Sequence, residues 1–362
     1  MKLARWIYRY ALALFFLAFG QAAMARGQEF GVAQRAVTFV DKTRPIKASG
    51  QFPGSPDRRL DLVVWYPTKA APSSEDKGHP ALRGPWPLVL YAHGTMGHAD
   101  NATHIVRELV RHGYVVAAPN FPLTSPESFA RISSPDLSDV VNQTKDLSFM
   151  IDSLSADPFF GPLIDNHKIG SMGHSLGAVT NYFAAVGSKN REPRIAAFAL
   201  LGAGDPVQAA LSNDMGFMGN WTAPVHVPVL FLSAEKDVFA RMTGGAHAAY
   251  YRVPAPKYEI FVNKGVHIWF RDATDQPADN KNPDCLFFER SAPGMVVPGC
   301  EERVALIGPA VQQEITRAAI LAFFDAYLKN DPSGRTRLLG IDRKYPGHTV
   351  TLHEDYSAAS AP

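Results

Sequence analysis

Short apolar segments alternate with amphipathic segments through the middle of the chain, and this alternation predicts the fold. The apolar segments have the length of strands buried on both faces: Leu88 to Ala92, Tyr114 to Ala118, Ile169 to Met172, Ile195 to Leu201, Val229 to Ser233 and Tyr258 to Val262. The amphipathic segments have helical spacing, as in the sets Ile105, Val106, Leu109, Val110 and Leu147, Met150, Ile151, Leu154. Because such strands need helices on both faces of a parallel sheet, the pattern predicts an α/β fold.

The two ends of this pattern define the expected domain. Two earlier strands, Arg35 to Val40 and Leu60 to Tyr66, precede a polar loop at residues 70–85. A final amphipathic helix, Val311 to Leu328, closes the domain, and we expect the polar stretch after it to be loosely held. The expected organisation is a main domain at residues 26–330, an insertion within it at 271–308, and a C-terminal tail at 331–362.

Residues 1–25 differ from the rest of the chain and have the pattern of a signal peptide. Lys2, Arg5 and Arg9 precede an apolar run from Ala11 to Phe19, and the segment ends in Ala-Met-Ala at residues 23–25. The apolar run is too short to cross a bilayer comfortably, so we expect cleavage after this triplet. The product would be a secreted or periplasmic protein without a stable membrane anchor. An uncleaved anchor is the alternative.

Charge and cysteine content narrow the possible functions. The 362 residues include 36 Lys and Arg against 34 Asp and Glu, with no basic run that could neutralise a row of phosphates. We therefore expect no nucleic-acid partner. The two cysteines are Cys285 and Cys300, and in an exported protein we expect them to form a disulfide. Two free buried thiols are the alternative.

The sequence Gly-His-Ser-Leu-Gly at residues 173–177 is the clearest chemical signal. It lies between the strand that ends at Met172 and a helix that begins at Ala178. This strand–turn–helix context is typical of a nucleophile elbow, because a tight turn raises the serine hydroxyl clear of the sheet and larger flanking side chains would collide. We therefore expect Ser175 to be a nucleophile, with backbone N–H groups of the helix start directed at an oxyanion. An ordinary glycine-rich turn is the alternative.

A serine hydroxyl needs a base, and the base needs a carboxylate to orient it. Both residue types follow later predicted strands in the order that such hydrolases use, first Asp237 and then His267. Loops at the carboxyl ends of parallel strands converge, so we expect Asp237 to orient His267 and His267 to activate Ser175. Glu235, two residues nearer its strand, is the competing acid.

The loop after the strand Leu88 to Ala92 supplies the other half of the expected oxyanion hole. It reads His-Gly-Thr-Met-Gly at residues 93–97, and we expect the backbone N–H groups of Thr95 and Leu176 to bind the developing negative charge. The competing interpretation is a metal cluster formed by His93, His98, Asp100 and His104. These residues lack a recognised metal-ligand spacing, so we expect no metal.

Several stretches outside the elbow form a wider family pattern. They are Val37 to Asp41, Arg44, Val64 to Pro67, His93-Gly94, Gly113 to Pro119, Asp146 to Phe149 and Ala322 to Leu328. With the elbow they cover most of the mature chain, which resembles secreted α/β-hydrolases similar to dienelactone hydrolases and plasma-type platelet-activating factor acetylhydrolases, with cutinase-like polyesterases as relatives. The resemblance implies an α/β-hydrolase fold and a serine esterase. Two positions depart from the pattern: dienelactone hydrolases have cysteine in place of Ser175, and Ala178 replaces a second glycine that often ends the family elbow.

The expected chemistry is acyl transfer to water without a cofactor, in which Ser175 attacks an ester carbonyl. We expect a small-molecule or lipid-like ester as substrate, and the sequence indicates no oligomeric state. Apolar and aromatic residues in the loop Asn120 to Val141 and the segment Met215 to Trp221 suit the wall of a pocket for an apolar group. The candidate substrate-contacting residues are Met96, Phe121, His174, Phe217, Trp221 and Trp269. The alternative is that these side chains belong to the core.

Two other functions stay open. The same three residues would also serve a peptidase or amidase, since acyl chemistry does not reveal the leaving group. A non-catalytic binding protein on this fold is the second alternative. It predicts a broken triad, whereas Ser175, Asp237 and His267 are all present.

Overall fold

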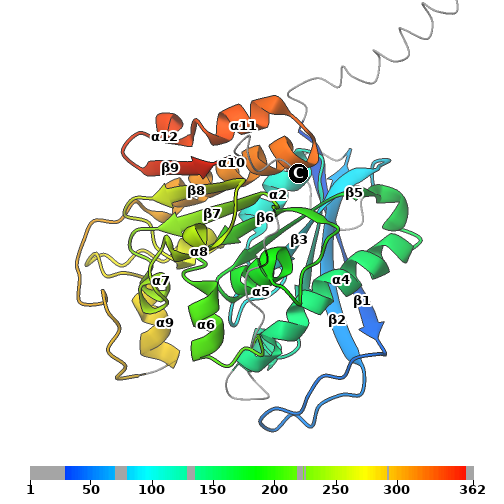
Figure 1. Ribbon diagram of the computed structural model, residues 1–362, viewed down its shortest axis with the longest axis horizontal. Coiled ribbons are helices and arrows are strands. Elements are labelled where there is room, and N and C mark those ends of the chain that lie inside the picture. Colours follow the sequence, from blue (N-terminus) through cyan, green and yellow to red (C-terminus); the bar gives the residue numbers. More distant parts are fainter. Residues whose placement is uncertain are drawn as a thin grey trace, which may run out of the picture.

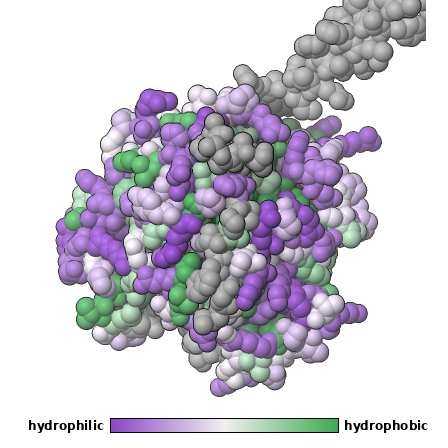
Figure 2. Space-filling model, viewed as in Figure 1, coloured by the Kyte–Doolittle hydropathy of each residue, from purple (hydrophilic) through white to green (hydrophobic). Residues whose placement is uncertain are grey.

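The computed structural model describes residues 29–69, 80–128, 135–217, 223, 226–291 and 293–355. The expected signal peptide at residues 1–25 and the pocket candidate Trp221 lie outside the described residues. Figure 2 shows one face of the molecule, on which hydrophilic side chains predominate and apolar ones form small separate groups. In the described part of the chain, no helix combines the length and the apolar character needed to span a membrane.

The described strands form one nine-stranded sheet in the order β1-β2-β4-β3-β5-β6-β7-β8-β9 (Figure 1). Neighbours from β4 through β8 pair parallel, whereas β1 with β2, β2 with β4, and β8 with β9 pair antiparallel. This confirms the predicted α/β fold with a mostly parallel sheet. The bounds are β1 (Gly31–Asp41), β2 (Arg58–Thr68), β3 (Trp86–Ala92), β4 (Val115–Asn120), β5 (Ile164–His174), β6 (Ile195–Leu201), β7 (Val229–Ala234), β8 (Lys257–Val262) and β9 (Thr349–Glu354).

Helices cover both faces of the sheet. One apolar cluster contains residues of α4, α5, α6 and α8, and a second contains residues of α2, α10, α11 and α12. In Figure 1, α4, α5 and α6 lie in front of the sheet. The helices are α2 (Thr103–Arg111), α4 (Val140–Ala156), α5 (Leu176–Val186), α6 (Pro206–Ser212), α7 (Val238–Met242), α8 (Ala248–Arg252), α9 (Asp284–Ser291), α10 (Pro309–Leu328), α11 (Pro332–Leu338) and α12 (Ile341–Lys344).

Strand β3 shows why the central segments are apolar without interruption. Leu88 and Leu90 belong to the first cluster, while Val89 and Tyr91 belong to the second. Successive side chains of a strand point to opposite faces, so a strand covered on both sides needs an apolar residue at every position. All four of these side chains are fully buried.

The tail that we expected to be loosely held is folded onto the domain as far as residue 355. Helices α11 and α12 bury Leu338, Ile341 and Tyr345 against the second cluster, and β9 pairs antiparallel with β8 at the edge of the sheet. The expectation was wrong because only a few apolar residues, spaced among polar ones, are needed to attach short elements to an existing surface. An edge strand with one solvent-facing side lacks the strong apolar pattern of a central strand.

The carboxyl ends of the parallel strands lie at one edge of the sheet. Ala92 at the end of β3 is level with Gly173 near the end of β5, and Ala234 of β7 is level with Val262 of β8. The loops that carry the candidate site residues all leave the sheet at this edge, as expected for the ligand sites of open α/β sheets.

Candidate active site

Ser175 occupies the sharp turn between β5 and α5. Its backbone has φ 56° and ψ −118°, a conformation that side-chain-bearing residues rarely adopt outside strained functional turns. The turn needs glycine on both sides. A Cβ atom on Gly173 would lie 2.2 Å from the Gly177 carbonyl oxygen, and one on Gly177 would lie 2.0 Å from the Ala92 carbonyl oxygen of β3. The pattern at residues 173–177 therefore forms the strained turn that the sequence predicts for a nucleophile elbow.

Asp237 and His267 meet across the loops that follow β7 and β8. The His267 Nδ1 atom lies 2.7 Å from Asp237 Oδ2, and the two side chains are almost fully buried. Asp237 is fixed in turn by the start of α7, because its Oδ1 accepts a hydrogen bond from the Ala240 N–H at 2.8 Å. Gly202 leaves room for the pair, since a Cβ atom there would lie 2.7 Å from His267 Nδ1.

Ser175 and His267 line the same cavity. Within the described part of the chain, the His267 Nε2 atom has no hydrogen-bond partner, and neither does the Ser175 hydroxyl. Because Asp237 binds Nδ1, Nε2 is the ring nitrogen of His267 that can accept a proton from a group in the cavity. Contacts between nucleophile and base are often long before a substrate is bound, and they shorten in the complex.

The competing acid Glu235 lies elsewhere. Its Oε2 atom accepts a hydrogen bond from the Lys264 N–H at 2.8 Å, and its Oε1 atom is 3.1 Å from the Lys236 ammonium. Glu235 therefore joins the β7 and β8 loops at the protein surface, while Asp237 is the carboxylate in contact with the His267 ring.

The pKa values of the two buried histidines beside Ser175 are shifted in opposite directions. Burial opposes protonation of His267, but the charge and hydrogen bond of Asp237 outweigh it and raise the pKa of His267 above its ordinary value. Burial lowers the pKa of His174 well below its ordinary value, with the neighbouring His267 and Arg271 adding to the effect. His174 is thus neutral, and its Nε2 atom lies 3.1 Å from the His267 carbonyl oxygen, so it braces the base.

Thr95 and Leu176, the two residues expected to form the oxyanion hole, both lie at the cavity that Ser175 lines. Leu176 is the first residue of α5, and both residues line the cavity beside Ser175. Among the described residues, no group accepts a hydrogen bond from the backbone N–H of either one. Gly94 brings the Thr95 loop close to the elbow, since a Cβ atom on it would lie 2.9 Å from the Ser175 Cβ. N–H groups without an acceptor, on residues that line one cavity, are the kind of donor that an oxyanion needs.

The residues of the alternative metal cluster have separate roles. His93 is fully buried, accepts a hydrogen bond at Nε2 from the Phe121 N–H at 3.0 Å, and has a pKa lowered to about 4 by burial. His98 pairs with Asp100 at the surface, and His104 Nε2 lies 3.3 Å from the Phe270 carbonyl oxygen. Over the ranges that the structure describes, no three His, Cys, Asp or Glu side chains are grouped to hold a metal ion.

The cavity has a volume of about 310 Å³ and a mainly apolar lining. Of the six predicted contact residues, His174 lines it, and Met215 of the predicted segment does so too. Phe121, Phe217 and Trp269 are core residues instead: they pack on the His93 ring, stack on the Phe183 ring, and donate to the Asp275 carbonyl oxygen, respectively. Met96 donates its N–H to the Thr124 carbonyl oxygen and shapes the oxyanion loop rather than the cavity wall.

The cavity has an aromatic wall that the sequence did not predict. Phe239 of α7 stacks on the His267 ring at a centroid distance of 4.4 Å, and Phe287 and Phe288 of α9 pack against Phe239. All three line the cavity, together with Met242, Ile268, Arg271 and Asp284. The insertion at 271–308, to which the sequence assigned no role, therefore supplies part of the site. The adjacent Phe287 and Phe288 were the available signal, but nothing in the sequence indicated where α9 packs.

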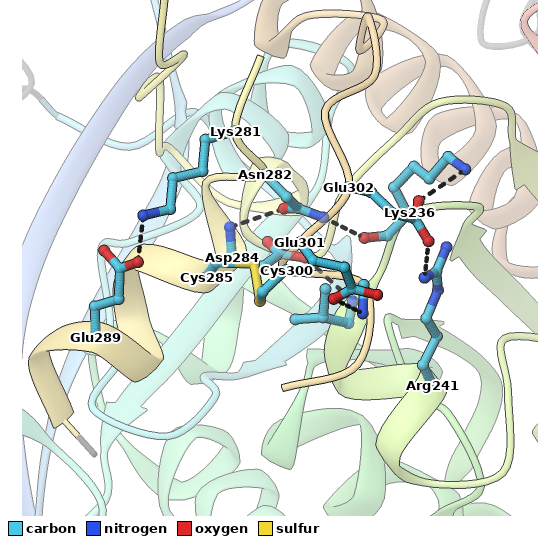
Figure 3. Close-up of a disulfide and its surroundings, with 12 residues drawn as sticks. Lys236, Arg241, Lys281, Asn282, Asp284, Cys285, Glu289, Cys300, Glu301 and Glu302 are labelled. Carbon is cyan, nitrogen blue, oxygen red and sulfur yellow. Dashed lines mark hydrogen bonds and ion pairs between the residues drawn. A yellow bond between two sulfur atoms is a disulfide. The ribbon is translucent and has the colours of Figure 1, made fainter. Parts of the chain in front are cut away.

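The predicted disulfide is confirmed, and it fixes α9. Cys285 in the first turn of α9 is joined to Cys300 with a Cα–Cα distance of 5.7 Å, as Figure 3 shows. Ion pairs surround the bridge: Arg241 of α7 lies 2.7 Å from Glu302, and Lys281 pairs with Glu289 of α9. The Arg241–Glu302 pair thus attaches the insertion to α7, while the disulfide and the Lys281–Glu289 pair connect parts of the insertion to each other.

Comparison with known proteins agrees with this geometry. A family model described as chlorophyllase matches residues 68–216, a range that contains Thr95 and Ser175 and ends before Asp237. Among solved structures, a ferulic acid esterase from Streptomyces cinnamoneus is similar, with 22% sequence identity, a TM-score of 0.59, and coverage of 85% of this chain and 93% of that chain. No curated protein matches the sequence significantly. The two matches support a carboxylic ester hydrolase of the α/β-hydrolase fold.

Proposed function

We propose that this chain is an exported serine hydrolase that cleaves carboxylic esters through an acyl-enzyme, with Ser175 as nucleophile, His267 as base and Asp237 as the carboxylate that orients the base. The observation that carries the proposal is that His267, in contact with Asp237 at 2.7 Å, lines the same apolar cavity as a serine held in a strained turn. Few arrangements other than nucleophilic catalysis need these features together.

The mechanism follows from the positions of the side chains. His267 Nε2 removes the proton of the Ser175 hydroxyl as the serine oxygen attacks the ester carbonyl carbon. The carbonyl oxygen becomes negative and accepts hydrogen bonds from the Thr95 and Leu176 N–H groups. His267 then gives its proton to the leaving alcohol, and the acyl group stays on Ser175. A water molecule repeats the sequence and releases the acid.

The cavity supports an apolar or aromatic group as part of the substrate. Phe239, Phe287 and Phe288 form one wall, and aliphatic side chains such as Leu176 and Val179 face the same space. Burial of apolar surface in such a pocket contributes about 25 cal/mol per Å² removed from water. The similar solved structure is named for an ester of ferulic acid, an aromatic acid, and this fits the same class of acyl group.

Replacement of the nucleophile tests the proposal. We expect Ser175→Ala to lower hydrolysis of p-nitrophenyl esters by about 10⁶-fold and to abolish labelling by a fluorophosphonate probe, because no other group can carry the acyl intermediate. The assays would use exported protein from a bacterial host, which we expect to begin at Arg26. Thr180→Ala, a change of a nearby hydroxyl that bonds to Gln143, is the matched control and should keep its activity within a few-fold.

The outcomes separate the candidate functions. Activity that survives in Ser175→Ala would reject the assignment. Hydrolysis of peptides in preference to esters would favour the peptidase or amidase. A wild-type protein that neither turns over esters nor reacts with the probe would point to a binding protein on this fold.

A further inference from the structure

The insertion brings a second buried carboxylate to the loops that carry Asp237 and His267. Asp284, at the first position of α9, is fully buried and lines the active-site cavity. Its Oδ2 atom accepts a hydrogen bond from the His267 N–H at 2.9 Å, and its Oδ1 atom accepts one from the Ile268 N–H at 2.9 Å. The Val238 N–H also points to Oδ2, at 3.4 Å. One carboxylate thus receives N–H groups from both loops.

We propose that Asp284 is a positioning residue for the ester hydrolysis: by binding the backbone on both sides of the Asp237–His267 contact, it fixes the distance and angle between acid and base. The inference rests on the proposed function of Ser175, Asp237 and His267. It assigns the insertion at 271–308 a part in catalysis beyond shaping the cavity.

A carboxylate suits this position better than any other side chain. Ionised aspartate is an acceptor at both oxygens, so it can satisfy three converging N–H donors at once. An asparagine of the same shape has one acceptor oxygen, and its NH₂ group would face either the His267 or the Ile268 N–H. One buried donor would then lose its partner, and the turn that begins at His267 would shift.

Asp284 is itself held in place from two directions. The Asn282 side chain donates to the Lys236 carbonyl oxygen at 2.6 Å, and its oxygen accepts the Asp284 N–H at 3.0 Å. Lys236 immediately precedes Asp237. On the other side, the disulfide begins at Cys285, the next residue of α9 (Figure 3). The Asp284 carboxylate is therefore positioned from both sides in the sequence: Asn282 links its segment to the Asp237 loop, and the disulfide at Cys285 fixes the start of α9.

The charge of Asp284 should affect the pH profile of the activity, which a purely structural role would not. The charged or titratable groups around the His267 ring are Asp237, Asp284, Arg271 and the neutral His174. Burial, and next the charge of Asp237, raise the pKa of Asp284 to about 6. Its negative charge raises the pKa of His267, while Arg271 acts in the opposite direction. Activity requires neutral His267. Removal of the Asp284 charge must therefore move the acid limb of the pH profile to lower pH.

Two variants of the full-length enzyme separate hydrogen bonding from charge, with p-nitrophenyl butyrate as substrate. Asp284→Asn should lower kcat by about 10- to 100-fold, with little change in KM, and should shift the acid limb to lower pH. Asp284→Glu keeps the charge but displaces the oxygens, so kcat should fall while the acid limb stays near that of the wild type. Glu289→Gln, a charge removal on an exposed residue of the same helix, is the matched control and should match the wild type.

The results either support or reject the role of Asp284. If Asp284→Asn folds and retains the wild-type kcat and pH profile, the inference is wrong, while an active wild type leaves the proposed function standing. An inactive wild type would reject the proposed function instead. If neither Asp284 variant folds, Asn282→Ala is the test, because it removes the hydrogen bond to Lys236 and leaves the Asp284 carboxylate present. A lower kcat in Asn282→Ala supports the inference, and an unchanged kcat overturns it.

Discussion

The two halves of the candidate site are held by different means. On the elbow side, Ser175 is fixed by main-chain packing: its N–H donates to the Leu201 carbonyl oxygen of β6, and Gly177 packs directly against Ala92 of β3. On the acid–base side, Asp237 and His267 lie on loops joined by side chains of the insertion. The Ser175 elbow is part of the sheet itself, whereas the Asp237–His267 pair depends on contacts with the insertion at 271–308.

This difference explains why the halves respond differently to change. The elbow glycines pack directly against the main chain of their neighbours. The first atoms that an added Cβ atom would meet there are backbone atoms, which cannot rotate away as a side chain can, so it must displace the backbone. A loop held by hydrogen bonds and a disulfide can lose one contact and keep the others. We therefore expect changes on the elbow side to affect folding, and changes on the insertion side to affect the rate and binding of a folded enzyme.

The largest effect on the free energy of unfolding should come from Gly177→Ala. The added Cβ would lie 2.0 Å from the Ala92 carbonyl oxygen, which is main chain of a central strand, so we expect a loss of about 3 kcal/mol or more in the free energy of unfolding. Urea denaturation measures this loss. Gly294→Ala, in the insertion, is the comparison variant: unlike Gly177 it has a positive φ, of 87°, and nothing lies within 4 Å of its Cβ position, so it tests backbone strain without a collision. Its cost should be about 1 to 2 kcal/mol. Equal losses at the two positions would remove the distinction between the halves.

The sequence allowed the elbow side of the site to be predicted better than the part that the insertion forms. The elbow and the strands were predictable because their signals are local: glycines that flank Ser175, and apolar residues at every position of strands such as β3. Asp237 and His267 could be located because the fold places the ends of β7 and β8 at one edge. The roles of Asp284, Phe287 and Phe288 were not predictable, because they depend on where a long insertion packs.

The errors have a physical pattern as well. Phe121, Phe217 and Trp269 were proposed for the pocket from their aromatic character, but large aromatic side chains are most often buried in a core, and all three are. Chain proximity to a catalytic residue was also misleading. Trp269, two residues after His267, points away to the Asp275 carbonyl oxygen, whereas Phe239, from helix α7, stacks on the His267 ring.

The next prediction concerns the catalytic rate and tests which carboxylate orients the base. Asp237→Asn should leave the fold intact and lower kcat by about 10⁴-fold, because an amide at this position favours the wrong tautomer of His267. Glu235→Gln is the matched control two residues away. It affects a surface contact with Lys264 and Lys236, so we expect kcat within a few-fold of the wild type. A larger loss in Glu235→Gln than in Asp237→Asn would reverse the assignment of the acid.

The smallest effect should come from removal of the disulfide in the double variant Cys285→Ala, Cys300→Ala. The bridge closes a loop with a sequence separation of 15 residues, a size associated with about 3 kcal/mol at most, and the loss should be confined to the insertion. Because α9 keeps its hydrogen bonds but loses its covalent closure, we expect Phe287 and Phe288 to form a looser wall. KM for apolar esters should rise by about two- to tenfold, which is less than the effect of one missing methylene in a well-formed hydrophobic pocket.

Reductant provides the control for this variant within the same assay. Prolonged treatment of the wild type with dithiothreitol should bring its KM toward that of the double variant, while the variant itself should not respond. The fall in kcat should be smaller than in Asp284→Asn, since the carboxylate and its N–H donors are still present. If loss of the bridge instead unfolded the whole domain in step with Gly177→Ala, the insertion would be part of the same cooperative unit as the elbow, and the two halves of the site would not differ in the way proposed.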